Sequence, residues 1–126
     1  MSLEIDKLLI ERLFEQAKES PRLRMNYDLR TSSADTSQRM LNALLPGTEV
    51  PIHHHESTSE TVVCLCGRLE VMIYEELPAG SFQEISRHLL CLAEGKYGIQ
   101  IPAGAWHTIC VLEPSVIFEA KDGAYK

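Results

Sequence analysis

The sequence predicts an all-β domain, a sandwich or a barrel, preceded by one amphipathic helix. Apolar residues recur at helical spacing near the N-terminus, and short segments rich in Val, Ile, Leu and Cys follow, separated at intervals by Pro and Gly. A chain of 126 residues with 44% apolar residues can build one core, so we expect a single domain over residues 1–126.

Residues 3–19 are predicted to form the helix. Its apolar positions lie at helical spacing between Glu, Lys and Arg: Leu8, Leu9, Leu13, Phe14 and Ala17. Because a residue before proline avoids the helical region, Ser20 and Pro21 should end it.

A β-barrel is predicted over residues 38–120. The expected strands are short apolar runs at 38–45, 61–66, 69–74, 98–101 and 116–120. Turn signals separate them at 46–47, 67, 78–80, 95, 102–104 and 113–114. The run 61–66 is apolar on both faces, which is expected where one face lines a barrel and a second sheet, the helix or another subunit covers the other.

Charge and composition limit the partners. The net charge is -6, with 18 acidic and 12 basic side chains, so the chain offers no counter-charge to nucleic acid or an anionic membrane. Small molecules or proteins remain as possible partners.

The apolar stretches are short and the N-terminus carries Glu4 and Asp6. We therefore expect a cytoplasmic protein with neither a spanning helix nor a signal peptide. We accordingly expect the four cysteines to be reduced core residues: Cys64, Cys66, Cys91 and Cys110.

Two blocks, 47–67 and 95–107, predict a mononuclear metal site. Because side chains alternate along a strand, His53 and His55 should point to one side and His54 to the other. The expected ligands are His53, His55, Glu60 and His107. Imidazole and carboxylate together suit one Zn, Fe, Ni or Mn ion per chain rather than calcium or magnesium. An octahedral ion held by these groups keeps open positions for water, dioxygen or substrate. His88, outside both blocks, is expected in a solvated loop.

The two blocks resemble the motifs of the cupin superfamily. The first motif, G-x5-H-x-H-x3,4-E-x6-G, matches at every position from Gly47 to Gly67. The second, G-x5-P-x-G-x2-H-x3-N, matches at Pro102, Gly104 and His107, with Lys96 in place of the leading glycine and Val111 in place of the asparagine. The stretches 20–24, 38–44, 106–108 and 119–125 are similar to small WbuC-type cupin metalloproteins. This resemblance implies a double-stranded β-helix, or jelly-roll barrel, a homodimer, and an association with O-antigen and other surface polysaccharides.

Other residues are predicted to bind the ligand or to act in catalysis near the metal ion. Arg24 and Arg39 lie within the family-like stretches and are expected to bind an anionic ligand, such as a uronic acid or a nucleotide sugar; pairing with surface acids is the alternative. Trp106 is expected to wall the pocket. Tyr97 and Glu119 are the expected catalytic groups, the first as an acid or donor and the second as an acceptor for an imidazole N–H.

The strand after Glu60 raises one further expectation. If it stays regular, Val62, Cys64 and Cys66 share one face and line the barrel, either as plain packing or with a thiol near the ion.

Three functions remain open. The chain could be a metal-dependent isomerase or lyase acting on a small carbohydrate, sugar acid or nucleotide sugar. It could be a non-haem iron dioxygenase of a small organic acid, or a sugar-binding or sensing module without turnover. One fold hosts many reactions, so the site itself has to decide among them.

Overall fold

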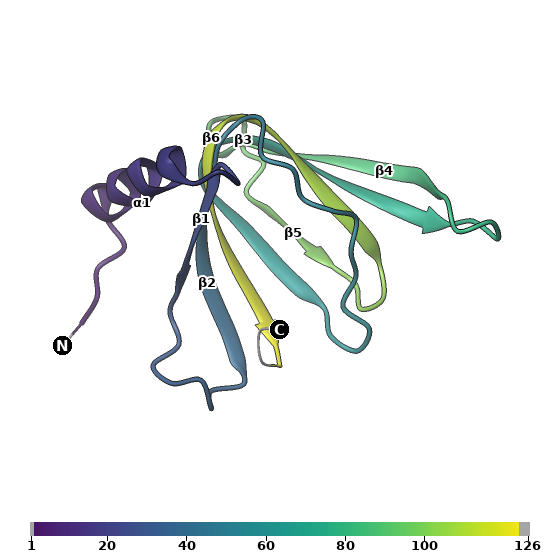
Figure 1. Cartoon of the computed structure of the whole chain (residues 1–126), viewed down its shortest axis with the longest axis horizontal. Helices are drawn as coiled ribbons and strands as arrows, with labels where there is room; N and C mark the ends of the chain where they lie inside the picture. Colours follow the sequence, from purple (N-terminus) through teal and green to yellow (C-terminus); the bar gives the residue numbers. More distant parts are fainter. Residues whose placement is uncertain (1, 124–126) are drawn as a thin grey trace.

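The structure is a computed structural model that describes residues 2–123, and it confirms a mostly antiparallel β-fold with one N-terminal helix (Figure 1). Tyr125, at the end of the last family-like stretch, lies outside the described residues. The elements in chain order are α1 (Lys7–Glu19), β1 (Arg24–Asp28), β2 (Ser37–Leu44), β3 (Glu60–Glu76), β4 (Phe82–Leu90), the short 3-10 turn η1 (Leu92–Glu94), β5 (Gly98–Ile101) and β6 (Trp106–Asp122).

Helix α1 begins later than predicted, at Lys7, because Asp6 caps it. The Asp6 carboxylate accepts a hydrogen bond of 2.9 Å from the backbone N–H of Leu9, which satisfies one of the free donors of the first turn. Leu9, Leu13 and Ala17 are buried against the sheet, whereas Leu8 is 62% exposed. The buried residues thus follow one stripe of the predicted pattern.

The sheet has the strand order β1-β2-β6-β3-β4, and β5 pairs with β3. Strands β3 and β6 are long and pair with each other along most of their length. The first part of β3 also pairs with β5, and its second part pairs with β4. Both long strands bend, so the sheet folds into two halves that face each other (Figure 1).

The bend lies where the sequence predicts turns at Gly67 and at 113–114. Neither ends a strand: β3 and β6 run through these positions, and their register shifts between Cys64 and Leu69. A β-bulge turns a strand without ending it, so the same residues that signal a turn here form a corner of the sheet. The predicted strands 61–66 and 69–74 are therefore one strand, and 116–120 is only the end of β6.

Strands β1 and β4 are absent from the sequence prediction. Strand β4 carries Gln83, Glu84, Ser86 and Arg87, and most of its residues are exposed, so it shows no apolar pattern. It forms because its backbone pairs with β3, an interaction that leaves no trace in side-chain composition. His88 lies on this strand, exposed, and not in a loop as predicted.

Two apolar clusters stabilise the fold. The first fills the space between the two halves and includes Val62, Cys64, Val71 and Ile117. The second joins α1 to the outer face of β2 and β6. The bulge places Cys66 in this second cluster, so it does not share the face of Cys64 as a regular strand would require.

The structure forms no disulfide among the described cysteines. Cys64 and Cys91 are buried and Cys66 is half-buried, but Cys110 is exposed, so the predicted burial is wrong for that residue. Within residues 2–123 no helix is both long and apolar enough to cross a bilayer.

Candidate metal centre

The four predicted ligands converge between the two halves of the sheet. Each offers one ligand atom, and these atoms all lie within 4.8 Å of one another. Glu60 begins β3 in one half, while His107 lies near the start of β6 in the other. His53 pairs with His107 through two backbone hydrogen bonds of 3.0 and 2.8 Å, so the segment before β3 is held against β6. The cluster thus depends on the closure of the folded sheet.

Backbone carbonyls orient two of the imidazole rings. The Nδ1 atom of His53 lies 2.9 Å from the carbonyl of Pro51, and that of His107 lies 2.8 Å from the carbonyl of Ala105. A carbonyl only accepts, so each Nδ1 carries a proton, and when the ring is neutral its Nε2 has the lone pair. This is the arrangement in which metal-ligating histidines are commonly held.

The Glu60 carboxylate is the charged centre of the cluster. Its Oε2 lies 2.9 Å from Nε2 of His55 and 3.6 Å from Nε2 of His107. Glu60 is 7% exposed and His107 is 3% exposed. Nε2 of His107 is buried and, among the described residues, has no hydrogen-bond partner. A buried imidazole nitrogen without a partner, beside a buried carboxylate, fits a divalent cation, so these residues could hold one.

Burial and the charges within the cluster shift the pKa values of its residues in opposite directions. Burial lowers the pKa values of His53 and His55 below the ordinary range. Burial would raise the pKa of Glu60, but its contacts with His107 and the other imidazoles outweigh burial and lower it. Glu60 is thus held ionised and His53 and His55 are held neutral, which are the states that bind a metal ion, whereas contact with Glu60 raises the pKa of His107 despite burial.

Glu119 is a second carboxyl group close to the cluster. It is paired with Val62 of β3 and Met40 of β2 in the sheet register, on the same inward face as Glu60. Burial and the charge of Glu60 raise the pKa of Glu119 to about 7, although a hydrogen bond to Asn42 opposes this. A carboxyl group with this pKa can both give and take a proton near neutral pH.

Replacing Glu119 by glutamine is expected to change the pH dependence of stability in metal-free protein. The folded wild type keeps the Glu119 proton up to about pH 7, whereas an unfolded carboxyl loses it near its ordinary value of 4.5. The wild-type free energy of unfolding should therefore fall as pH rises between these values, by roughly 3 kcal/mol from this group. Urea unfolding at several pH values should show that Glu119→Gln lacks this decrease. The exposed Glu113→Gln should keep it, and identical wild-type and Glu119→Gln profiles would contradict the assignment.

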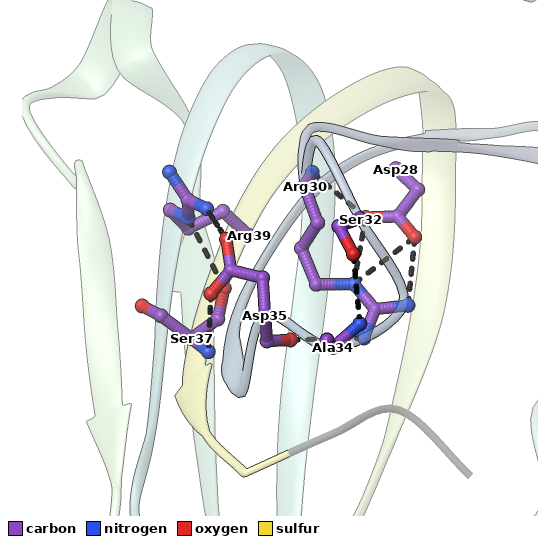
Figure 2. A network of polar contacts seen from close by, with 7 residues as sticks. All are labelled: Asp28, Arg30, Ser32, Ala34, Asp35, Ser37 and Arg39. Atoms are coloured by element: carbon purple, nitrogen blue, oxygen red, sulfur yellow. Dashed lines mark hydrogen bonds and ion pairs between the residues drawn. The ribbon is translucent and has the colours of Figure 1, made fainter.

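The structure does not bring Arg39 to the metal cluster. Arg39 lies on β2 between the inward-facing residues Gln38 and Met40, so its side chain is on the outer face. There its guanidinium pairs with Asp35 and bonds the carbonyl of Ser37 at 3.1 Å, as Figure 2 shows. Nearby, Arg30 in the loop between β1 and β2 pairs with Asp28, the last residue of β1. Arg39 is therefore paired with a nearby acid, which is the alternative to ligand binding given for it above.

Arg24 also lies away from the cluster. It begins β1, and its Nη1 donates to the Glu49 carbonyl at 2.7 Å and to Thr48 Oγ1 at 3.3 Å. It lines a cavity of about 270 Å³ whose lining includes none of the four clustered residues. These hydrogen bonds join the start of β1 to the loop that follows β2, and a substrate role for Arg24 stays a prediction.

Trp106 and Tyr97 do not line the metal centre. Trp106 pairs with Tyr74 while His107 pairs with Ile73, so the two neighbours point to opposite faces. The Trp106 ring packs against the His54 ring at a tilt of 46°, with 3.8 Å between centroids, on the outer face. This agrees with the prediction that His54 faces away from the ion. Tyr97 is 61% exposed on the surface before β5.

Sequence reasoning missed Lys121, the cation that does lie near the cluster. The register places Lys121 between Gln38 and the predicted ligand Glu60, with all three on the inward face. Its positive charge also lowers the pKa of His55. Alternation gave a signal, because Lys121 lies two residues after Glu119 and must share its face. A groove of about 450 Å³ lies at this end of the sheet, lined by Lys121 and by hydroxyl groups that include Ser57, Thr58 and Ser59.

Solved structures share this fold. The protein TT1209 from Thermus thermophilus is 24% identical, with 96% of this chain and 98% of that chain covered and a TM-score of 0.62. The capsular polysaccharide assembling protein CapF from Staphylococcus aureus is 19% identical over 85% of this chain but only 30% of CapF, with a TM-score of 0.65. The cupin domain of Schizosaccharomyces pombe Cnp3 is 12% identical over 79% of this chain and 64% of that one, with a TM-score of 0.55.

These likenesses confirm the cupin jelly-roll fold. Comparison with curated proteins gave no match. A family model described as "Domain of unknown function (DUF6016)" matches residues 5–86, which include α1, the first three strands and three of the four clustered residues. The chain therefore belongs to the DUF6016 family, and it has the fold of the cupins.

Proposed function

We propose that this protein binds one divalent metal ion through His53, His55, Glu60 and His107 and acts on a small sugar or sugar acid. The observation that supports this most is the convergence of three imidazoles and one carboxylate in a partly buried cluster. A bound divalent ion would supply Lewis acidity to a coordinated hydroxyl or carbonyl oxygen.

The residues around the cluster would then divide the work. The carbonyls of Pro51 and Ala105 would hold the neutral rings of His53 and His107 in the tautomer whose Nε2 lone pair is free for the ion. Glu119, whose pKa is raised to about 7 by burial, would exchange a proton with the bound sugar or sugar acid. This division of roles suits an isomerase or a lyase, in which a proton is moved next to a polarised oxygen.

The biological setting is part of the same proposal. CapF is by its name a capsular polysaccharide assembling protein, and its likeness to this chain supports a sugar-related role. Because this chain spans 30% of CapF, the activity of the whole CapF protein is not carried over. Membership of the WbuC-type group, a role in O-antigen metabolism, a cytoplasmic location and a homodimer are the finer parts of the proposal, and the sequence resemblance and composition support them.

Metal analysis of protein purified without chelator tests the proposal. We expect about one Zn, Fe, Ni or Mn ion per chain, and removal by a chelator should lower the melting temperature. Free metal at roughly 100 times its Kd should stabilise the protein by about 2.7 kcal/mol. Protein that binds no divalent ion, or whose stability is unchanged by all of these metals, would contradict the proposal. Oxygen consumption with the iron-loaded protein and an organic acid would instead indicate a dioxygenase.

A further inference from the structure

One wall of the interior is polar where it adjoins the metal ligand Glu60. In the first cross-strand row, Gln38 of β2, Lys121 of β6 and Glu60 of β3 lie side by side. Four rows further along, Asn42 faces inward from β2 beside Ile117 and Cys64. The opposite wall is apolar and is formed by residues such as Val71 and Val111. Polar side chains are therefore concentrated on one side of the interior, next to the candidate ion.

Two of these side chains carry unpaired acceptors. Gln38 is 4% exposed, and its Oε1 atom is buried without a hydrogen-bond partner among the described residues. The Oδ1 atom of Asn42 is in the same condition. A buried acceptor without a partner destabilises a fold, so each such group calls for a specific explanation. Hydroxyl groups of a ligand would supply donors to both atoms.

Lys121 adds a positive charge to this wall. No ion pair between residues 2–123 includes it, although its neighbours in the row are an amide and a metal ligand. It also lines the groove of about 450 Å³ at the end of the sheet, together with Ser57, Thr58 and Ser59. The groove is lined mostly by hydroxyl side chains and by one acid, Asp122. An ammonium group between this groove and the candidate metal centre is placed to receive an anionic group of a ligand.

We infer that Lys121, Gln38 and Asn42 form a ligand subsite beside the metal centre that selects a hydroxylated carboxylic acid, such as a uronic acid, over the neutral sugar. Lys121 binds the carboxylate, and the amide oxygens of Gln38 and Asn42 accept hydrogen bonds from hydroxyls. The inference rests on the proposed function because the ligand must also reach the bound ion. It gives the anion-binding role to Lys121 in place of Arg24 and Arg39.

Calorimetric titration of metal-loaded protein with matched pairs tests the subsite. The probes are galacturonate against galactose and glucuronate against glucose, which differ by one carboxylate. We expect one of the acids to bind at least about tenfold more tightly than its neutral partner, as a charge-assisted contact provides. That preference should decrease as salt rises. This comparison uses wild-type protein alone, so it holds even if a variant fails to fold.

Variants assign the preference to a residue. Lys121→Gln should reduce acid binding about tenfold, to the level of the neutral sugar, while bound metal stays unchanged. Lys121→Arg should keep most of the preference. Lys7→Gln, the same charge change on the exposed face of α1, is the matched control. Gln38→Leu should weaken acid and neutral sugar alike, because it removes a hydroxyl contact.

Metal content measured on every sample separates the two proposals. Wild type that binds no metal would overturn the proposed function and this inference with it. Metal-loaded wild type that binds no acid, or binds acids and neutral sugars equally, would overturn the inference alone. Acid binding that survives Lys121→Gln unchanged would also overturn it.

Discussion

Replacing Glu60 by glutamine is expected to lower the affinity for the divalent ion at least about 100-fold, with the fold retained. Glu60 is the only carboxylate of the four clustered residues, and its Oε2 approaches both His55 and His107. An amide of the same shape keeps the packing but removes the negative charge that offsets the cation. Metal content after dialysis and metal titration of the apoprotein measure the loss.

A matched control lies four positions earlier in the chain. Glu56 is 89% exposed and lies 3.9 Å from the outward-facing His54, so Glu56→Gln makes the same chemical change outside the cluster. Its metal affinity should equal that of the wild type. Circular dichroism should show the same strand content for both variants, because the two apolar clusters contain neither residue. Unfolding of Glu60→Gln would mean that the metal site is structural, and unchanged affinity would remove Glu60 from the ligand set.

Replacing Gly67 by alanine is expected to destabilise the protein by about 3–4 kcal/mol. Gly67 has φ +92°, and a Cβ atom there would lie 2.3 Å from the Pro114 carbonyl oxygen and 2.3 Å from Ser115 Oγ. Both contacts involve the corner of β6, which cannot move without displacing the strand that carries His107. Alanine therefore adds a steric clash to the backbone cost of the positive φ. Urea unfolding should show a lower midpoint with an unchanged m-value.

Replacing Gly80 by alanine separates the steric clash from the backbone cost of a positive φ. The φ of Gly80 is +82°, but no atom of residues 2–123 lies within 4 Å of a Cβ built there, so Gly80→Ala has the backbone cost without the clash. We expect it to lose only about 1 kcal/mol. Equal losses at Gly67 and Gly80 would show that the corner tolerates a side chain, and that the close approach of β3 and β6 is not what glycine is needed for.

Local patterns were enough to predict which four residues cluster. His53, His55 and Glu60 lie within one short block, where alternation and spacing are properties of the chain itself. The same alternation would have placed Trp106 on the outer face of its strand, because it precedes the inward-facing His107. It would also have placed Lys121 on the same inward face as Glu119. Those two assignments were within reach of the sequence. Applying one rule to every residue of a strand would have found them.

The pairing of the strands could not be predicted from the sequence. Strand β4 is polar and exposed, so only its backbone hydrogen bonds to β3 define it. Gly67 reads as a turn residue, yet a bulge and the approach of β6 make it a corner within a strand. Turn residues specify a local change of direction, and whether the strand resumes in the same sheet depends on distant partners.

The helix, the all-β class and the identity of the four clustered residues follow from the chain alone, because helical spacing, alternation and ligand chemistry are short-range properties. The surroundings of the cluster depend on how distant segments meet. Gln38 and Lys121 reach Glu60 because β2, β6 and β3 are neighbours in the sheet, and Arg39 is directed to Asp35 on the opposite face. Contacts between residues this far apart in the chain arise from register and sheet closure, which no local pattern encodes.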